Sequence, residues 1–194
     1  MSTAPQLSTY RSLIAPRGLY SLTLGSVLGT TLWHSFIGGP ASLPHLPSAS
    51  RRIAYTTLAR PHFAALQAAL FPRFFALQSI ASAALLGLYA RAGKVSNWKT
   101  SLRSDRNVWA LAVMLAAGLG NWAVVGPWTT STMRRRHRRE KIEGKEYNDP
   151  TVSPQMLSLN SKFAKLHGVS SLLNLAFFLA AAGHAAVVGV EGIL

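Results

Sequence analysis

Residues 107–133 read NVWALAVMLAAGLGNWAVVGPWTTSTM, and these 27 residues include no Asp, Glu, Lys or Arg. A bilayer core about 30 Å thick is crossed by roughly 20 helical residues. Three other apolar stretches without such charges have comparable length, at residues 18–39, 74–90 and 166–190. The sequence therefore predicts an all-α fold, a four-helix transmembrane bundle with these four stretches as its spans.

Chain length limits the domain organisation. Four spans in 194 residues leave room for a single membrane domain and its connections. We expect an N-terminal tail over residues 1–17 and a four-span domain over residues 18–194, with a basic loop over residues 134–165. The sequence contains no cysteine, which excludes disulfides and thiolate metal ligands.

Positive charge dominates the chain, with 20 Lys and Arg against six Asp and Glu and a formal net charge of +14. The cations flank the apolar stretches, which indicates anionic lipid headgroups as partners and not nucleic acid. Thirteen cations fall in the connections after the first and third stretches. The positive-inside rule therefore predicts that both connections are cytoplasmic and that both termini lie on the other side.

Targeting signals leave two locations open for an integral, multi-pass protein. The first apolar stretch is longer than the core of a signal peptide, which favours an uncleaved span in an endomembrane, either the endoplasmic reticulum or the plasma membrane. The first acidic residue is Asp105, and an acid-free, Ser- and Thr-rich N-terminal segment is also typical of mitochondrial proteins. A mitochondrial membrane is the alternative.

Arginine is concentrated directly after the third stretch, where residues 134–139 read RRRHRR. Opposite charges at i and i+4, Arg136 with Glu140 and Arg139 with Glu143, predict a basic helical extension. A solvated helix end and a headgroup-binding patch explain this run equally well and are compatible. Each cation near an anionic surface contributes about 1 kcal/mol, so we predict lipid binding by Arg134, Arg135 and Arg138.

The segment before the second span has an apolar face of its own. Residues 61–71 place their large apolar side chains on one side of a helix. Pro72 then lacks the amide that would continue the helical hydrogen bonds. This pattern predicts an interfacial amphipathic helix that breaks at Pro72 and turns into the span over residues 74–90.

Polar residues inside the spans recur at helical spacing, as in Ser26, Thr30 and His34. In lipid such side chains bond across helices, so interhelical packing is the first interpretation. No Asp or Glu lies inside a span, and the sequence has no phosphate-binding loop, zinc-protease motif or nucleophile elbow. We therefore expect no enzymatic activity and no cofactor.

Three histidines, His34, His62 and His167, are predicted to lie at the same membrane face. Neutral imidazoles that converge there could bind a transition metal or titrate near neutral pH. Their spacing has no diagnostic value for a metal, so no metal site is predicted. A hydrogen bond within the bundle is the favoured role for His34, although an ionisable residue in a span is a functional candidate by default.

Four ordered blocks of sequence carry a family resemblance. They are WHSFIGGP from Trp33, LARPHFAALQAALFPRFF from Leu58, GPWTTSTM from Gly126 and HGVSSLLNL from His167. In content and spacing they resemble the transmembrane protein 205-like family, over about residues 18–194. The resemblance implies a four-helix multipass protein. This chain departs from the family pattern at Arg60-Pro61, where the family favours Leu-Pro-Arg, and in lacking the cysteines of the animal proteins, so drug export is not implied.

The four blocks fall at one predicted membrane face, which suggests a site for a lipid, an ion or a protein partner there. Its predicted members are His34, Arg60, Gln67, Thr129, Thr130, His167, Ser170 and Asn174, next to Arg134, Arg135 and Arg138. We expect a non-enzymatic protein that binds lipid headgroups, a membrane-protein partner or both, for example as an accessory subunit of a larger assembly. The alternative is a small transporter or metal-handling protein that uses a histidine-containing polar site.

Overall fold

The computed structural model describes residues 15–37, 58 and 60–192, and every regular element in them is helical. The first helix, α2 (Pro16–Leu32), continues into a π-helical turn, η1 (Trp33–Ile37). Helix α4 (Arg60–Tyr89) follows, with a second π-helical turn, η3 (Ala90–Lys94), and a short helix, α5 (Trp98–Ser104). The remainder is α6 (Arg106–Leu119), η4 (Gly120–Val125), α7 (Gly126–Glu143) and α8 (Pro154–Glu191).

Three helical segments among the described residues are long and apolar enough to cross a membrane: His62–Lys94, Arg106–Glu143 and Pro154–Glu191. The chain is therefore an integral membrane protein, as predicted. The first predicted span coincides with α2 and η1, but α2 itself has only 17 residues. The fourth span therefore stays a prediction.

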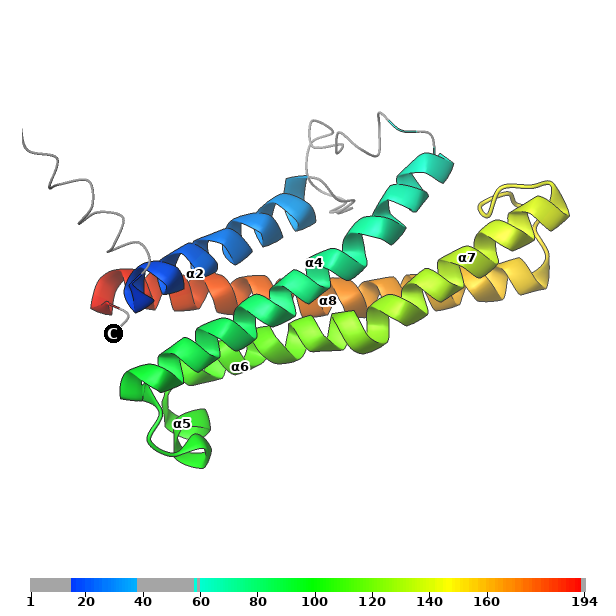
Figure 1. Cartoon of the computed structure of the whole chain (residues 1–194). Helices are drawn as coiled ribbons and strands as arrows, with labels where there is room; N and C mark the ends of the chain where they lie inside the picture. Colours follow the sequence, from blue (N-terminus) through cyan, green and yellow to red (C-terminus); the bar gives the residue numbers. More distant parts are fainter. Residues whose placement is uncertain (1–14, 38–57, 59, 193–194) are drawn as a thin grey trace, which may run out of the picture.

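The helices run alternately up and down (Figure 1). Helix α6 packs against α4 and α8, and α2 packs against the same two helices. The start of α2 and the end of α8 lie at one end of the bundle, together with α5 (Figure 1). The start of α4, the end of α7 and the start of α8 lie toward the opposite end, where α7 and α8 extend beyond the other helices as a two-helix arm (Figure 1).

The core lies in the half of the bundle near α5, where all four long helices meet. Its residues recur every three or four positions along each helix, the spacing that places side chains on one helical face. In lipid the packing of such side chains, more than their removal from water, holds the helices together. The buried members include Tyr20, Leu24, Val27, Leu85, Val108, Leu111, Met114, Phe177 and Ala181.

The predicted break at Pro72 is wrong. Helix α4 runs through Pro72 for 30 residues, so the structure has one helix where the sequence predicted an interfacial helix followed by a span. A guanidinium nitrogen of Arg73, Nη1, donates to the carbonyl oxygen of Ala69 at 2.6 Å. The carbonyl that Pro72 leaves without a helical donor is that of Ala68, so the Arg73 bond lies beside the lost bond and does not replace it, and α4 continues with one helical bond fewer.

The basic segment after the third apolar stretch is mostly helical and not a loop. Helix α7 continues through all the arginines of residues 134–139 and ends at Gly144, which adopts a left-handed conformation with φ of 64°. Helix α8 begins at Pro154, one residue after its cap Ser153, well before the predicted span at 166–190. Only residues 144–153 connect the two helices of the arm.

Candidate functional site

Two of the arginines of α7 hold the arm together. The guanidinium of Arg136 lies over the rings of Tyr147, at 4.1 Å, and Phe163, at 4.5 Å, and its side chain is only 9% exposed. Arg139 donates from Nε to Oε1 of Glu143 at 2.5 Å, as its i, i+4 spacing predicts. Arg139 also donates from Nη2 to the hydroxyl of Ser153 at 3.4 Å. Both cations therefore join α7 to the connecting segment, and Arg136 also contacts α8.

The predicted pair of Arg136 with Glu140 has a different arrangement. Glu140 accepts a hydrogen bond from the backbone N–H of Tyr147 at 2.9 Å. The chain turns back after Gly144 and brings the ring of Tyr147 over Arg136. A contact between α7 and this returning segment thus takes the place of a contact within one helix.

The other three arginines, Arg134, Arg135 and Arg138, are exposed. All three line a groove of about 500 Å³ between α4 and the η4–α7 segment. Its apolar wall includes Phe71, Pro72, Phe75 and Trp122. The groove thus combines an aromatic part with a cationic part.

Two irregular helical segments form the groove. Pro72 lacks the amide that would bond to the carbonyl of Ala68, and both residues line the groove. Opposite them, the π-helical turn η4 is closed by a bond from the N–H of Gly126 to the carbonyl of Asn121. A Cβ at Gly126 would lie 2.5 Å from that oxygen, so the turn requires glycine. Such π-helical turns occur frequently at functional sites.

Asn121 contributes a polar group to the groove wall. Its side chain is fully buried, and its Nδ2 donates to the backbone carbonyl of Ser170 at 3.1 Å. Its Oδ1 has no hydrogen-bond partner among the described residues. Thr130 and Ser131 add hydroxyl groups between this buried amide and the arginines.

A separate polar layer joins α2, α4 and α8. Nε2 of Gln78 donates to Oγ1 of Thr31 at 3.1 Å and to Oδ1 of Asn174 at 2.9 Å. Asn174 in turn donates from Nδ2 to the hydroxyl of Ser35. Asn174 is therefore an interhelical bridge, and Ser170 contributes a backbone carbonyl to the contact with η4.

The remaining predicted site residues lie in different surroundings. The ring of His34 packs against Phe71 and Phe74, with centroids 5.0 and 4.3 Å apart, whereas His167 stacks on Phe163 at 5.7 Å. The structure gives these histidines different ring partners. Gln67 is buried with Oε1 unpartnered, Thr129 donates to the carbonyl of Val125 at 2.7 Å, and the side chain of Arg60 lies outside the described residues. Within the described residues no three His, Asp or Glu side chains group as metal ligands.

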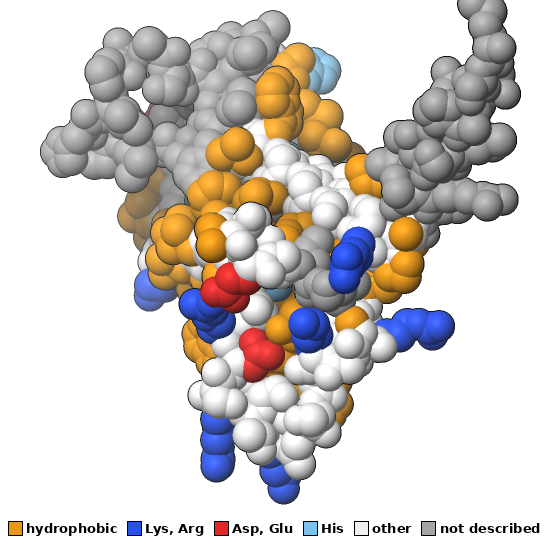
Figure 2. All heavy atoms as spheres, turned by 90° about the vertical axis from the view of Figure 1, so that its left-hand side faces the viewer, with side chains coloured by type: hydrophobic (Ala, Val, Ile, Leu, Met, Phe, Trp, Pro, Cys, Tyr) orange, Lys and Arg blue, Asp and Glu red, His pale blue; other side chains and the backbone are white. Residues whose placement is uncertain are grey.

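Sequence reasoning missed a polar chain at the other end of the bundle, which faces the viewer in Figure 2. Tyr20 Oη lies 2.5 Å from Nε2 of His184, and Nδ1 of His184 lies 3.0 Å from Oδ1 of Asn107. An amide oxygen only accepts, so Nδ1 donates and Nε2 accepts from Tyr20. Asn107 donates to Tyr89 Oη at 3.4 Å, and Tyr89 donates to Asp105 at 3.2 Å.

This chain of hydrogen bonds connects the four helices α2, α4, α6 and α8. Asp105 also caps α6, because its Oδ1 accepts from the N–H groups of Asn107 and Val108. Nearby, Arg106 pairs with Glu191 at the end of α8. The end of the bundle thus carries both acidic and basic side chains (Figure 2). The only signal in the sequence was an ionisable residue, His184, deep inside an apolar stretch.

The fold and groove define an integral membrane protein built as a helical bundle with an amphipathic groove at one end. Residues 22–138 match the family model described as "Domain of unknown function (DUF4149)", and the chain belongs to this family. The match extends from α2 into α7 and includes the three arginines of the groove. No curated protein and no solved structure matches the chain.

Proposed function

We propose that this protein is a non-enzymatic, four-span membrane protein whose arginine end binds anionic lipid headgroups. The observation that carries the proposal is the division of the α7 arginines. Arg136 and Arg139 have partners within the arm, whereas Arg134, Arg135 and Arg138 are exposed and line the groove. Among the described residues none pairs with these three exposed cations, so they are available to phosphate and carboxylate groups of lipids.

Tryptophans support a position of these arginines just outside the hydrocarbon core. Trp109 and Trp128 are both 59% exposed and lie 19 residues apart on the continuous α6–η4–α7 segment. At 1.5 Å per residue this separation is about 28 Å, close to the thickness of the hydrocarbon core. Tryptophan is enriched at both membrane interfaces. With Trp128 at one interface, Arg134 lies about 9 Å farther out along the axis, among the headgroups.

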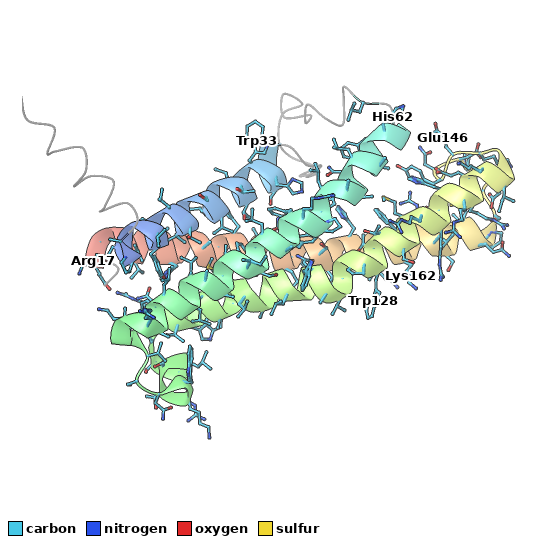
Figure 3. All side chains as sticks on the ribbon, viewed as in Figure 1. Arg17, Trp33, His62, Trp128, Glu146 and Lys162 are labelled. Atoms are coloured by element: carbon cyan, nitrogen blue, oxygen red, sulfur yellow. The ribbon has the colours of Figure 1, made fainter. Side chains whose placement is uncertain are left out.

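The same positions support α2 and η1 as the fourth span. Trp33, at the end of α2, points away from the bundle, as does Trp128 at the start of α7 (Figure 3). Trp33 lies 16 residues from Arg17, a length of about 24 Å in a helix. In this arrangement the termini share one side of the membrane, and the arginine arm lies on the cytoplasmic side, where anionic lipids are concentrated.

An endomembrane is the favoured location, with a mitochondrial membrane as the alternative. The proposal keeps the resemblance of the four sequence blocks to the transmembrane protein 205-like family. A membrane-protein partner and an accessory role belong to the same proposal, because bound anionic lipid can bridge two membrane proteins. The alternative, a small transporter or metal-handling protein with a histidine-containing polar site, has less support, because His34 and His167 have separate ring partners.

Lipid preference tests this function in reconstituted vesicles. Changing Trp33, Trp98 and Trp109 to Phe leaves Trp122 and Trp128, the two tryptophans next to the arginine end, as reporters. Dibrominated phosphatidylserine quenches tryptophans that it touches, and dibrominated phosphatidylcholine serves as the neutral reference. We expect phosphatidylserine to quench more strongly at equal lipid fractions and this excess to fall with added salt, which screens surface charges.

Matched variants assign the effect to the arginine end. Changing Arg134, Arg135 and Arg138 to Gln removes three cations, each worth about 1 kcal/mol near an anionic surface. The control changes Arg91, Lys94 and Arg103, which are exposed at the other end, to Gln. Equal loss of preference in both variants, or none in either, would refute the proposed site.

A further inference from the structure

We propose that the groove between α4 and η4–α7 holds one anionic phospholipid, with its phosphate between Arg134 and Arg138 and one acyl chain along Phe71, Phe75 and Trp122. This inference rests on the proposed function and adds to it a defined site with a single occupant. General attraction of anionic lipid to the arginine end would not require a groove at all.

The order of side chains along the helix axis matches an amphiphile at a membrane interface. Trp122 lies six residues before Trp128, about 9 Å toward the membrane interior, and Arg134 lies six residues after it, about 9 Å outward. Aromatic groups thus line the part of the groove inside the hydrocarbon core, and arginines line the part among the headgroups. A lipid molecule has the same order of chemistry along its length.

Arginine is suited to the headgroup part of the groove. Its planar guanidinium donates two parallel hydrogen bonds to one phosphate, which a lysine ammonium does not. Arg134 and Arg138 are four residues apart on α7, so they lie on the same side of the helix. Two guanidinium groups can therefore bind the same phosphate.

The hydroxyl groups of the groove fit the glycerol and ester region of a phospholipid, because a hydroxyl donates to an ester carbonyl oxygen. Thr130 and Ser131 lie between the arginines and the aromatic part. Polar groups in hydrocarbon are costly unless bonded, and the ester carbonyl oxygens of a lipid accept bonds from these two hydroxyls.

Native mass spectrometry of the full-length protein in detergent tests the inference. Phosphatidylserine, phosphatidylcholine and inorganic phosphate are titrated separately, and the bound mass is followed. We expect phosphatidylserine to saturate at one molecule per chain and to bind more tightly than phosphatidylcholine. Changing Arg134 and Arg138 together to Gln should weaken this binding roughly 30-fold, because each cation is worth about a fivefold change.

A second variant blocks the groove without touching its charges. Ala68→Phe places a ring in the groove, and we expect roughly a tenfold loss of phosphatidylserine affinity from the steric conflict. Ala84→Phe, at an exposed position of the same helix, is its control, and the double change of Arg91 and Arg103 to Gln is the control for charge. Because Arg134 and Arg138 are exposed, their variant keeps the test valid if Ala68→Phe fails to fold.

The possible results distinguish a failure of the groove site from a failure of the proposed headgroup binding. Phosphatidylserine binding that never saturates and ignores Ala68→Phe would overturn the groove site while leaving headgroup attraction in place. Equal binding of phosphatidylserine and phosphatidylcholine would overturn both. If inorganic phosphate alone binds and requires the same two arginines, the ligand is a free anion and the lipid assignment is wrong.

Discussion

Replacing Arg136 by Gln should loosen the arm without unfolding the bundle. Arg136 is 9% exposed, and its guanidinium lies 4.1 and 4.5 Å from the ring centroids of Tyr147 and Phe163. A cation over an aromatic ring contributes about 0.5–1 kcal/mol when exposed and about 2 kcal/mol when desolvated. With two rings and partial burial, we expect a loss of roughly 2 kcal/mol, which raises the population of the open arm roughly 30-fold.

Hydrogen exchange followed by mass spectrometry measures this opening in detergent or nanodiscs. Amides of residues 144–153 should exchange faster in Arg136→Gln, whereas those of α6 should keep their protection. Arg135→Gln, a neighbouring change at an exposed position, is the matched control. Arg136→Lys should lie between the two, because it keeps the charge but loses the planar group that stacks on the rings. Equal exchange in Arg136→Gln and Arg135→Gln would refute the proposed role of the ring contacts.

Three further predictions concern other parts of the molecule. Gly126→Ala should lower the thermal midpoint measured by circular dichroism, since its Cβ would meet a carbonyl oxygen of the π-helical turn at 2.5 Å; an unchanged midpoint would show that the turn relaxes freely. Tyr20→Phe removes the donor to His184, and we expect the free energy of unfolding in a denaturation series to fall by about 0.6–1.7 kcal/mol. A smaller decrease would contradict the role of this hydrogen-bond chain in holding the helices together. Hydrogen bonds from the hydroxyl and N–H of Thr151 lower the pKa of Asp149. The stabilisation of the connecting segment by Asp149 should therefore be complete above the ordinary carboxyl pKa and lost as the pH falls through the lower pKa of the folded state. An NMR titration of Asp149 with an ordinary midpoint would contradict this.

Local sequence patterns predicted the helices well. Charge-free stretches gave the positions of α2, α4, α6–η4–α7 and α8, because helix formation in lipid depends on the chain's own backbone bonds. The pair Arg139 and Glu143 followed from spacing alone. Pro72 was misjudged, since it removes one helical hydrogen bond and α4 nevertheless continues through it. The local pattern shows where the hydrogen bond is lost but not whether the helix tolerates the loss.

Contacts between helices were much harder to predict. Gly25 and Gly29 have the Gly-x-x-x-Gly spacing that is typical of close helix packing, but no atom of the described residues lies within 4 Å of a Cβ placed at either. The close approach is instead at Gly118, where a Cβ would lie 3.1 Å from Oγ of Ser79. Which small residue meets a neighbouring helix depends on helix rotation, and no periodicity within a single helix fixes this rotation.

The candidate site was predicted only in part. Arg134, Arg135, Arg138 and Thr130 line one groove, but the contribution of Phe71 and Phe75 depends on how α4 lies against α7. The bond between Tyr20 and His184 joins residues 164 positions apart, and no spacing rule connects them.

The arm has a consequence for electrostatic orientation. Four of the six acidic residues of the chain, Glu140, Glu143, Glu146 and Asp149, lie in its outer part. Lys141 and Lys145 lie among them, so four negative and two positive charges leave a net charge of −2 there, whereas the arginines lie nearer the bundle. Glu143 is 15 residues beyond Trp128, which places it about 22 Å from the interface in the proposed position. This distance exceeds the Debye length of about 8 Å in physiological salt, so the surface charge is screened there while the arm is upright. The arm is then a dipole perpendicular to the membrane. The anionic surface attracts its positive end, and it would repel the negative end if the arm tilted toward the membrane. Arm and surface together favour an upright arm that presents residues 144–153 to the aqueous phase at a fixed height.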